Sequence, residues 1–311
     1  MAGCGPGLTS SAGPRRWPRP TRMIAAGQDG RGPIERKWMT MDAYTGFAGV
    51  YDKFMDNIPY EQWESYVTGL LKDYGVNDGL VLELGCGTGN LTRLLSRRGY
   101  DMIAIDNSEE MLMIARDKAM DETMDILYLL QDMRSFELYG TVRAVVSICD
   151  SMNYITRPEE LCQVFRLVNN YLDPGGVFIF DMNTIHKYKD LIGNRTIAEN
   201  REDCSFIWDN YYYEDEQINE YELSIFVRDA WEDDQKAEAD NEGEGEPFIR
   251  YRETHYQRGY SLEEVKALLL EAGMSFVAAY DAFTKAPVRD DSERMYIIAR
   301  ENGKRIEEID L

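Results

Sequence analysis

The stretch LVLELGCGTGN combines glycines at alternating positions, Gly85, Gly87 and Gly89, with one acid, Glu83, in an apolar run. Glycines where a strand leads into a helix permit positive φ angles and let a ligand approach free backbone N–H groups. A carboxylate in a buried strand is costly unless it is paired, so Glu83 is expected to meet a ligand ammonium or a backbone network. The loop therefore predicts a ligand-binding site.

The spacing of these glycines indicates which ligands are disfavoured. Nicotinamide- and flavin-binding loops follow the pattern G-x-G-x-x-G, whose third glycine lets helix and strand pack closely. Here the pattern is G-x-G-x-G, and the position of that third glycine is occupied by Asn90. A nicotinamide-dependent oxidoreductase is therefore disfavoured.

Histidines and cysteines offer few other catalytic groups. The chain has two histidines, His186 and His255, and five cysteines without a CxxC pair. No metal site is expected from this spacing, and the odd cysteine count argues against a disulfide framework and for a reducing cytoplasm. His255 is the imidazole that could act as a general base, although a lone histidine on a strand can equally be structural. Cys149 carries no signal of an activated nucleophile.

Charge and hydropathy disfavour further classes of function. The net charge is −22, which disfavours a nucleic-acid substrate because phosphate recognition needs clustered Lys and Arg. No apolar run approaches the roughly 20 residues of a membrane-spanning helix, so we expect no membrane partner. Residues 1–40 differ from the rest: positions 1–38 hold five prolines and seven Arg or Lys against two acids. This composition predicts a disordered extension.

The elements that must position these groups alternate along the chain. Short apolar strands are expected at 80–84, 102–105, 126–130, 142–148 and 177–180, with amphipathic helices between them. Asn107 with Glu110, and Ser261 with Glu264, predict helix starts. Strands that alternate with helices pair in parallel through right-handed crossovers, which predicts an α/β fold with a doubly wound, mostly parallel, seven-stranded Rossmann-like sheet.

An interruption of this alternation predicts a second part. YELSIFV and FIRYRETHYQ alternate apolar and polar residues, as antiparallel strands with one wet face do. The domain bounds are therefore predicted as 41–183 with 261–311 for the main domain, and 184–260 for an antiparallel β insertion before the last helix and strands. Trp208 and the run 211–213 could line a pocket or pack on a sheet face.

Several acids after the strands complete a pattern that resembles the class I S-adenosylmethionine-dependent methyltransferases. The pattern begins with Glu83 and the three glycines and continues with Asp106 in IAIDNSEEM and Asp132 in LLQDMRSF. LDPGGVFIFD resembles the post-sheet motif of that family. The resemblance covers about residues 44–300 and implies S-adenosylmethionine as cofactor.

The resemblance also implies roles for individual residues. Asp106 would bond the ribose hydroxyls, Asp132 would contact the adenine amino group, and the Met133 N–H would assist. Cys149 would offer its carbonyl to the cofactor ammonium. The implied cofactor-binding residues are Tyr51, Glu83, Gly85, Cys86, Gly87, Gly89, Asp106, Asn107, Asp132, Met133 and Cys149.

A narrower likeness comes from the leading segment FAGVYDKFMDNIPYEQW and the insertion. Together they resemble small bacterial stand-alone methyltransferases related to those acting on glycine or amino sugars. This likeness implies that the insertion covers the acceptor, as a lid, or forms a homodimer contact. It makes Tyr51 a candidate for the methionine end of the cofactor and for catalysis beside His255, with aromatic packing as the alternative. Asp150, Asn153, Tyr154 and Arg258 are candidates for binding the acceptor, and a salt bridge is the alternative for Arg258.

The implied reaction is in-line displacement of the methyl group by a nitrogen or oxygen of a small-molecule acceptor. Such a reaction needs positioning and water exclusion more than covalent help. An RNA or protein acceptor, and a cofactor-binding module without catalysis, are the alternatives that stay open. No residue type identifies the acceptor.

Overall fold

The computed structural model describes residues 51, 52, 54, 60–228 and 248–303. The predicted disordered extension 1–40 and most of the leading aromatic segment lie outside these residues. In the described part of the chain, no helix combines the length and the apolar character that crossing a bilayer demands.

A seven-stranded sheet forms the main body, in the order β10-β11-β5-β4-β1-β2-β3. Its strands are β1 (Gly79–Leu84), β2 (Tyr100–Asp106), β3 (Ile126–Leu130), β4 (Val142–Ser147), β5 (Leu172–Asn183), β10 (Ser275–Asp281) and β11 (Arg294–Arg300). The five strands from β1 to β5 pair in parallel, whereas β11 pairs antiparallel with both β5 and β10. The predicted doubly wound, mostly parallel sheet is confirmed.

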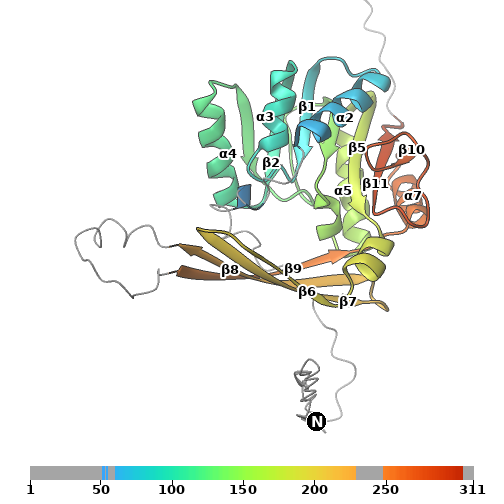
Figure 1. Ribbon diagram of the computed structural model, residues 1–311. Helices are drawn as coiled ribbons and strands as arrows, with labels where there is room; N and C mark the ends of the chain where they lie inside the picture. The colour runs from blue at the N-terminus through green and yellow to red at the C-terminus, as the bar shows by residue number, and fades with distance from the viewer. Residues whose placement is uncertain (1–50, 53, 55–59, 229–247, 304–311) are drawn as a thin grey trace, which may run out of the picture. The chain divides into compact units, whose positions relative to one another are not determined.

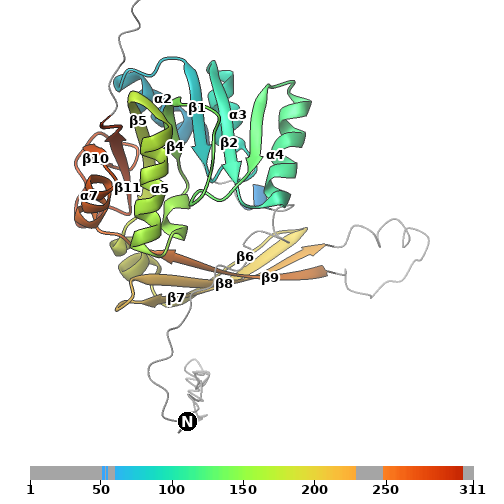
Figure 2. The same ribbon diagram turned by 180° about the vertical axis from the view of Figure 1, so that it is seen from behind.

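Helices cover both faces of this sheet, as Figures 1 and 2 show from opposite sides. The helices are α2 (Tyr60–Asp73), α3 (Asn90–Arg97), α4 (Glu109–Asp121), α5 (Pro158–Tyr171) and α7 (Leu262–Glu271). Successive residues of a strand point to opposite faces. Val81 accordingly packs in the core with α2 and α3, whereas Leu82 packs in the core with α5 and α7. Strand order reverses beside β1, where sheets of this type bind ligands.

Helix starts follow the predicted chemistry at one position and shift at another. Ser261 caps α7, because its hydroxyl accepts a hydrogen bond from the Glu264 N–H at 3.2 Å. The predicted cap at Asn107 is wrong by one residue. Ser108 caps α4 instead and accepts from the Met111 N–H, while Asp106 takes the Ser108 N–H.

A second sheet of four antiparallel strands lies below the first in Figure 1, in the order β6-β7-β8-β9. Its strands are β6 (Arg195–Asn200), β7 (Cys204–Tyr213), β8 (Ile218–Arg228) and β9 (Phe248–Arg258). Two short helical turns, η1 (Ser151–Tyr154) and η2 (Lys187–Ile192), follow β4 and β5 at the edge that faces this sheet. The sheet falls within the predicted insertion, and its role as lid or dimer contact stays a prediction.

Candidate functional site

The three glycines of the loop after β1 meet two different demands. All three have positive φ angles, between 53° and 72°. A Cβ at Gly85 would lie 2.7 Å from the Ser151 hydroxyl, and one at Gly89 would lie 2.6 Å from the Tyr128 hydroxyl. A Cβ at Gly87 would meet nothing within 4 Å. Gly85 and Gly89 therefore allow close packing, whereas Gly87 faces open space.

That open space is a first cavity at the carboxyl ends of β1, β2 and β4, with a volume of about 160 Å³. Most of the residues predicted to bind the cofactor meet in its wall. They are Tyr51, Glu83, Gly85, Cys86, Gly87, Asp106, Asn107, Asp132, Met133 and Cys149. Among the predicted cofactor residues, Gly89 alone lies outside the wall and packs behind it.

Asp106 holds the loop in shape. Its carboxylate accepts the Gly87 N–H at 2.7 Å and the Ser108 N–H at 2.9 Å, one on each oxygen. Burial raises the pKa of Asp106, and these backbone donors oppose the rise. A carboxylate has about four acceptor positions, so the side chain can still accept a hydrogen bond from a ligand hydroxyl.

Glu83 is buried, and its carboxyl accepts a hydrogen bond from the Thr92 hydroxyl at 2.5 Å. Burial raises the pKa of Glu83 to about 8, with a further increase from the Asp106 charge and an opposing effect of Thr92. Without ligand the group is therefore protonated at neutral pH. The sequence predicted a ligand ammonium or a backbone network as its partner, and the structure has the Thr92 hydroxyl from α3 at this position.

Asp52 is a residue that the sequence analysis missed. Its carboxylate accepts hydrogen bonds from Thr88 at 2.7 Å and Asn90 at 2.9 Å, and it pairs with Lys118 at 2.5 Å. Burial raises its pKa, but these three partners outweigh burial, so the pKa is lowered overall. Asp52 thereby fixes the segment that carries Tyr51 onto the glycine loop. Its neighbour Tyr51 was the signal that could have found it.

A second, larger cavity of about 320 Å³ lies between the two sheets. Five predicted residues line it: Tyr51, Cys149, Asp150, Tyr154 and His255. Three of them, Tyr51, Cys149 and Tyr154, line the first cavity as well. The two cavities therefore adjoin at these three residues.

The loop at this junction is held in an unusual backbone conformation. Cys149 and Asp150 are non-glycine residues with φ angles of 62° and 54°. The fully buried carboxylate of Asp181 accepts both of their N–H groups, at 3.2 and 2.8 Å. Arg294 pairs with Asp181 and with Asp150, each at 2.7 Å. Strained backbone of this kind persists only where its surroundings fix it and is often functional.

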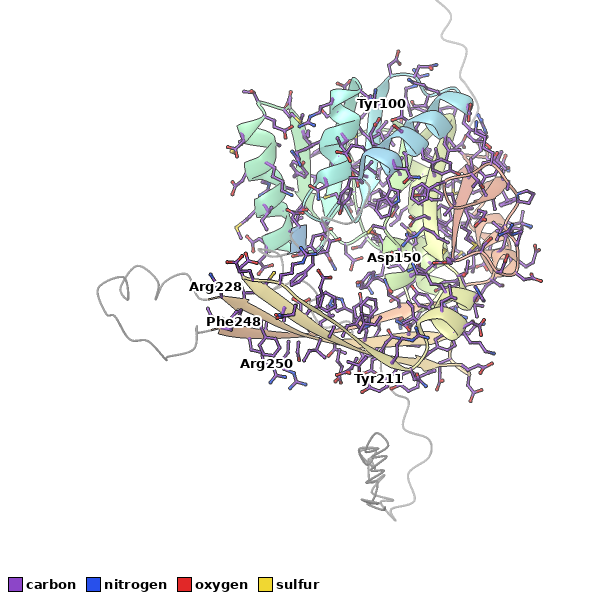
Figure 3. All side chains as sticks on the ribbon, viewed as in Figure 1. Tyr100, Asp150, Tyr211, Arg228, Phe248 and Arg250 are labelled. Atoms are coloured by element: carbon purple, nitrogen blue, oxygen red, sulfur yellow. The ribbon has the colours of Figure 1, made fainter. Side chains whose placement is uncertain are left out.

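Burial raises the pKa of the Cys149 thiol, which keeps it protonated and poorly nucleophilic. The loop that carries Cys149 and Asp150 lies at the edge of the larger sheet that faces the smaller sheet, where Figure 3 labels Asp150.

Side chains from the second sheet complete the junction. His255 is buried, with its Nε2 atom 3.0 Å from Glu253 and its Nδ1 atom 3.3 Å from the Tyr154 hydroxyl. The Tyr154 and Tyr221 hydroxyls lie 2.5 Å apart, and the Tyr221 ring stacks on His255. The register of β8 and β9, which pairs Tyr221 with His255, sets this arrangement.

Two of the predicted acceptor-binding residues have other surroundings. Asn153 is fully buried and joins η1 to the ends of β5 and β9, through Asn183 and the Arg258 carbonyl. Arg258 forms the salt bridge considered as its alternative, to Glu264 at 2.9 Å. Neither residue lines either cavity.

The tyrosine-rich part of β7 divides between two faces of the sheet. Trp208 lines the second cavity, whereas Tyr211, labelled in Figure 3, is exposed on the face turned away from the larger sheet. Residues that the sequence analysis missed in this wall include Trp63, Lys187, Gln257 and Arg294. They come from segments far apart in the chain, and no local spacing connects them.

The first cavity fits a ligand that carries positive charge and hydroxyl groups. Its wall holds the acids Glu83, Asp106 and Asp132 and one basic residue, Arg134, which pairs with Asp132. Within the described ranges, no three His, Cys, Asp or Glu side chains gather as metal ligands. Because Glu83 is protonated at neutral pH, the negative charge of this wall comes from Asp106 and Asp132. These carboxylates and the open glycine loop suit the sulfonium, ammonium and ribose of S-adenosylmethionine.

Comparisons with known proteins agree with this fit. Residues 81–176 match a family model described as a methyltransferase domain. The chain is 33% identical over 260 residues to the putative methyltransferase YqeM of Bacillus subtilis (strain 168), which covers 83% of this chain and 97% of YqeM.

Solved structures extend the comparison. The crystal structure of a S-adenosylmethionine-dependent methyltransferase from Clostridium acetobutylicum ATCC 824 has a TM-score of 0.72 at 27% identity, covering 84% of this chain and 100% of that one. The sugar N-methyltransferase KedS8 from Streptoalloteichus sp ATCC 53650 shares the fold, with a TM-score of 0.65 at 17% identity, covering 82% and 93%.

The role of Asp106 predicts the effect of removing it. Asp106→Ala deletes an acceptor of two backbone N–H groups and of ligand hydroxyls, so affinity for S-adenosylhomocysteine should fall at least about tenfold, or about 1.4 kcal/mol. Calorimetric titration measures this. Asp101→Ala, an exposed position on the same strand, should bind as wild type does. Equal affinity of both variants would contradict our assignment of the site.

The raised pKa of Glu83 predicts a pH dependence of stability. The folded state keeps this proton up to about pH 8, whereas an unfolded glutamate loses it near its ordinary value of 4.5. The folded state therefore binds more protons between these values, and stability falls as pH rises, by at most about 1.4 kcal/mol per pH unit from this group. Urea unfolding between pH 5 and 8 should give a shallower decline for Glu83→Gln than for wild type. The exposed control Glu263→Gln should follow wild type, and parallel curves for all three proteins would refute the prediction.

Proposed function

Because the chain belongs to the S-adenosylmethionine-dependent methyltransferases and uses that cofactor, we propose that it methylates a nitrogen or oxygen of a small-molecule acceptor held in the second cavity. The observation that carries this proposal is the junction at Tyr51, Cys149 and Tyr154, where the two cavities adjoin. When bound, the cofactor supplies an electrophilic methyl group on a sulfonium. An acceptor in the second cavity can approach that methyl group at this junction.

The surroundings of the second cavity support a small acceptor. Apolar and aromatic side chains form most of its wall, and the second sheet covers it. Sites for small molecules are concave and mostly apolar, with a few convergent polar groups. KedS8, whose fold this chain shares, is a sugar N-methyltransferase, and this supports an acceptor of similar size.

Placement of the acceptor supplies much of the rate. Two reactants held in a near-attack geometry lower a barrier by up to about 7–11 kcal/mol. The backbone of Cys149 and Asp150, fixed by Asp181, gives the junction a rigid wall. The aromatic lining excludes water, which strengthens electrostatic interactions inside the site.

Removal of the acceptor proton has a defined path through the second sheet. The Glu253 carboxyl accepts a hydrogen bond from the His255 Nε2–H, which leaves Nδ1 to accept one from the Tyr154 hydroxyl. As the acceptor loses its proton to the Tyr154 oxygen, the Tyr154 proton passes to His255 Nδ1. The resulting imidazolium is paired with Glu253. In this proposal His255 acts as a base through Tyr154, without touching the acceptor.

The class of acceptor can be tested by following a labelled methyl group from the cofactor into its product. With methyl-labelled cofactor and a cell extract separated into small-molecule, RNA and protein fractions, label should enter the small-molecule fraction. Leu223→Trp narrows the second cavity and should abolish this transfer while S-adenosylhomocysteine still binds. Ser224→Trp, on the opposite face of the same strand, should transfer normally. Label in RNA or protein alone, or full transfer by Leu223→Trp, would refute the proposal.

The proton path predicts a separate loss of rate. General-base contributions are typically about 10²–10⁴-fold, so His255→Gln should slow label transfer to the same small-molecule fraction within that range. Tyr154→Phe should slow it similarly, while Tyr211→Phe on the exposed face should leave the rate unchanged. Titration with S-adenosylhomocysteine verifies that the His255 variant still binds. An undiminished rate in His255→Gln would exclude this path.

A further inference from the structure

The polar end of the second cavity contains two acids whose oxygens are already occupied. Asp181 accepts the N–H groups of Cys149 and Asp150 and one arm of Arg294. One oxygen of Asp150 accepts the other arm of Arg294 at 2.7 Å, and the second accepts the Gln257 amide at 2.6 Å. All four carboxylate oxygens therefore have donors without any contribution from lysine.

Lys187 lies in the same wall and forms no ion pair with a carboxylate of the described residues. Its Nζ atom donates to the Asn183 side-chain oxygen at 3.0 Å. Among the described residues, no carboxylate oxygen lies within the 4.0 Å of an ion pair with this atom. An ammonium group carries three N–H donors, so Lys187 keeps donors for a further acceptor.

The charge of Lys187 is only partly offset by its surroundings. Burial lowers the pKa of Lys187, and the nearby Arg294 charge lowers it further, whereas Asp150, Glu293 and Asp181 act in the opposite direction at longer range. A half-buried ammonium without an ion-pair partner has a desolvation cost that an anion in contact would reduce.

The remainder of the wall is suited to an apolar body. Trp208, Tyr221 and Phe206 come from the second sheet, and Trp63 and Phe54 come from the main body. Aromatic side chains bind flat or apolar groups by burial and by stacking. The polar end of the cavity thus has two cationic groups, Arg294, which is paired with Asp150 and Asp181, and Lys187, which has no ion pair. Aromatic side chains line much of the rest.

We propose that the methyl acceptor carries an anionic group, a carboxylate or a phosphate ester, on an aromatic or apolar body, and that Lys187 binds the anion. This inference rests on the proposed function, because it identifies the occupant of the second cavity as the acceptor. It selects among small molecules by charge: the anion lies at Lys187 and Asn183, and the apolar body lies along the aromatic wall.

Binding of three small probes tests the inference without knowledge of the natural acceptor. Phenylacetate, phenyl phosphate and neutral phenylacetamide are titrated by ligand-observed NMR into the protein saturated with S-adenosylhomocysteine. In wild type at least one anion should bind about tenfold or more tighter than phenylacetamide, a difference of about 1.4 kcal/mol. The tighter of the two anions identifies carboxylate or phosphate as the recognised group.

Variants connect the preference to Lys187. Lys187→Met, which removes the charge at similar length, should lose the preference for the anion, and Lys187→Arg should retain it. Lys189→Met is the matched control, because Lys189 is exposed two residues away and pairs with Glu214; it should behave as wild type.

Two results would overturn the inference: wild type that binds no anion more tightly than phenylacetamide, or a preference that survives in Lys187→Met. Failure of the proposed function is a different observation, namely wild type that does not bind S-adenosylhomocysteine or does not methylate small molecules. Titration of S-adenosylhomocysteine into each variant separates the two, since Lys187 lies outside the first cavity.

Discussion

The buried carboxylate of Asp181 is the group on which the rest of the site depends. It lies at the carboxyl end of β5, fully buried, and holds two successive left-handed residues, Cys149 and Asp150, by their N–H groups. Burial raises its pKa, and the charge of Arg294 opposes that rise. Removing one partner of such a buried pair generally costs 3–5 kcal/mol, roughly, because the other charge is left uncompensated. The junction between the two cavities thus depends on one ion pair between neighbouring strands.

The same network connects the two sheets. Arg294 binds Asp150, Asp150 accepts the amide of Gln257 on β9, and Asn153 accepts from and donates to the backbone at the end of β5 and donates to that of β9. A hydrogen bond to a charged group contributes roughly 1.5–3 kcal/mol, about twice as much as a neutral one. Polar contacts near the site therefore help to hold the second sheet against the first. These contacts set the distance between the two sheets at the second cavity.

Most residues of the first cavity that were predicted from the sequence are confirmed as its lining, because they lie at the ends of consecutive strands. Glu83, Asp106 and Asp132 each follow an apolar run, and parallel strands bring their carboxyl ends to one edge. Asp181 lies two residues before the end of β5 and carries the same signal, an acid after FIF, but the sequence analysis assigned it no role. The cap of α4 lies one residue later than expected: the Ser108 hydroxyl accepts from the Met111 N–H, while the Ser108 N–H donates to Asp106.

The second cavity could not be predicted in the same way. Lys187 and Arg294 are more than a hundred residues apart and meet only because β11 pairs antiparallel with β5. His255 faces the site through the register of β8 and β9, and shifting that register by one residue would turn its side chain to the outer face. Local patterns identify strands but do not determine which strands pair or in which register. A glycine loop can thus be predicted from the sequence because its residues are neighbours in the chain, whereas the wall of the second cavity is set by contacts between distant strands. If the second cavity holds the acceptor as we propose, substitutions in the second sheet can change the acceptor while most of the first cavity, built from the ends of β1, β2 and β3, stays intact.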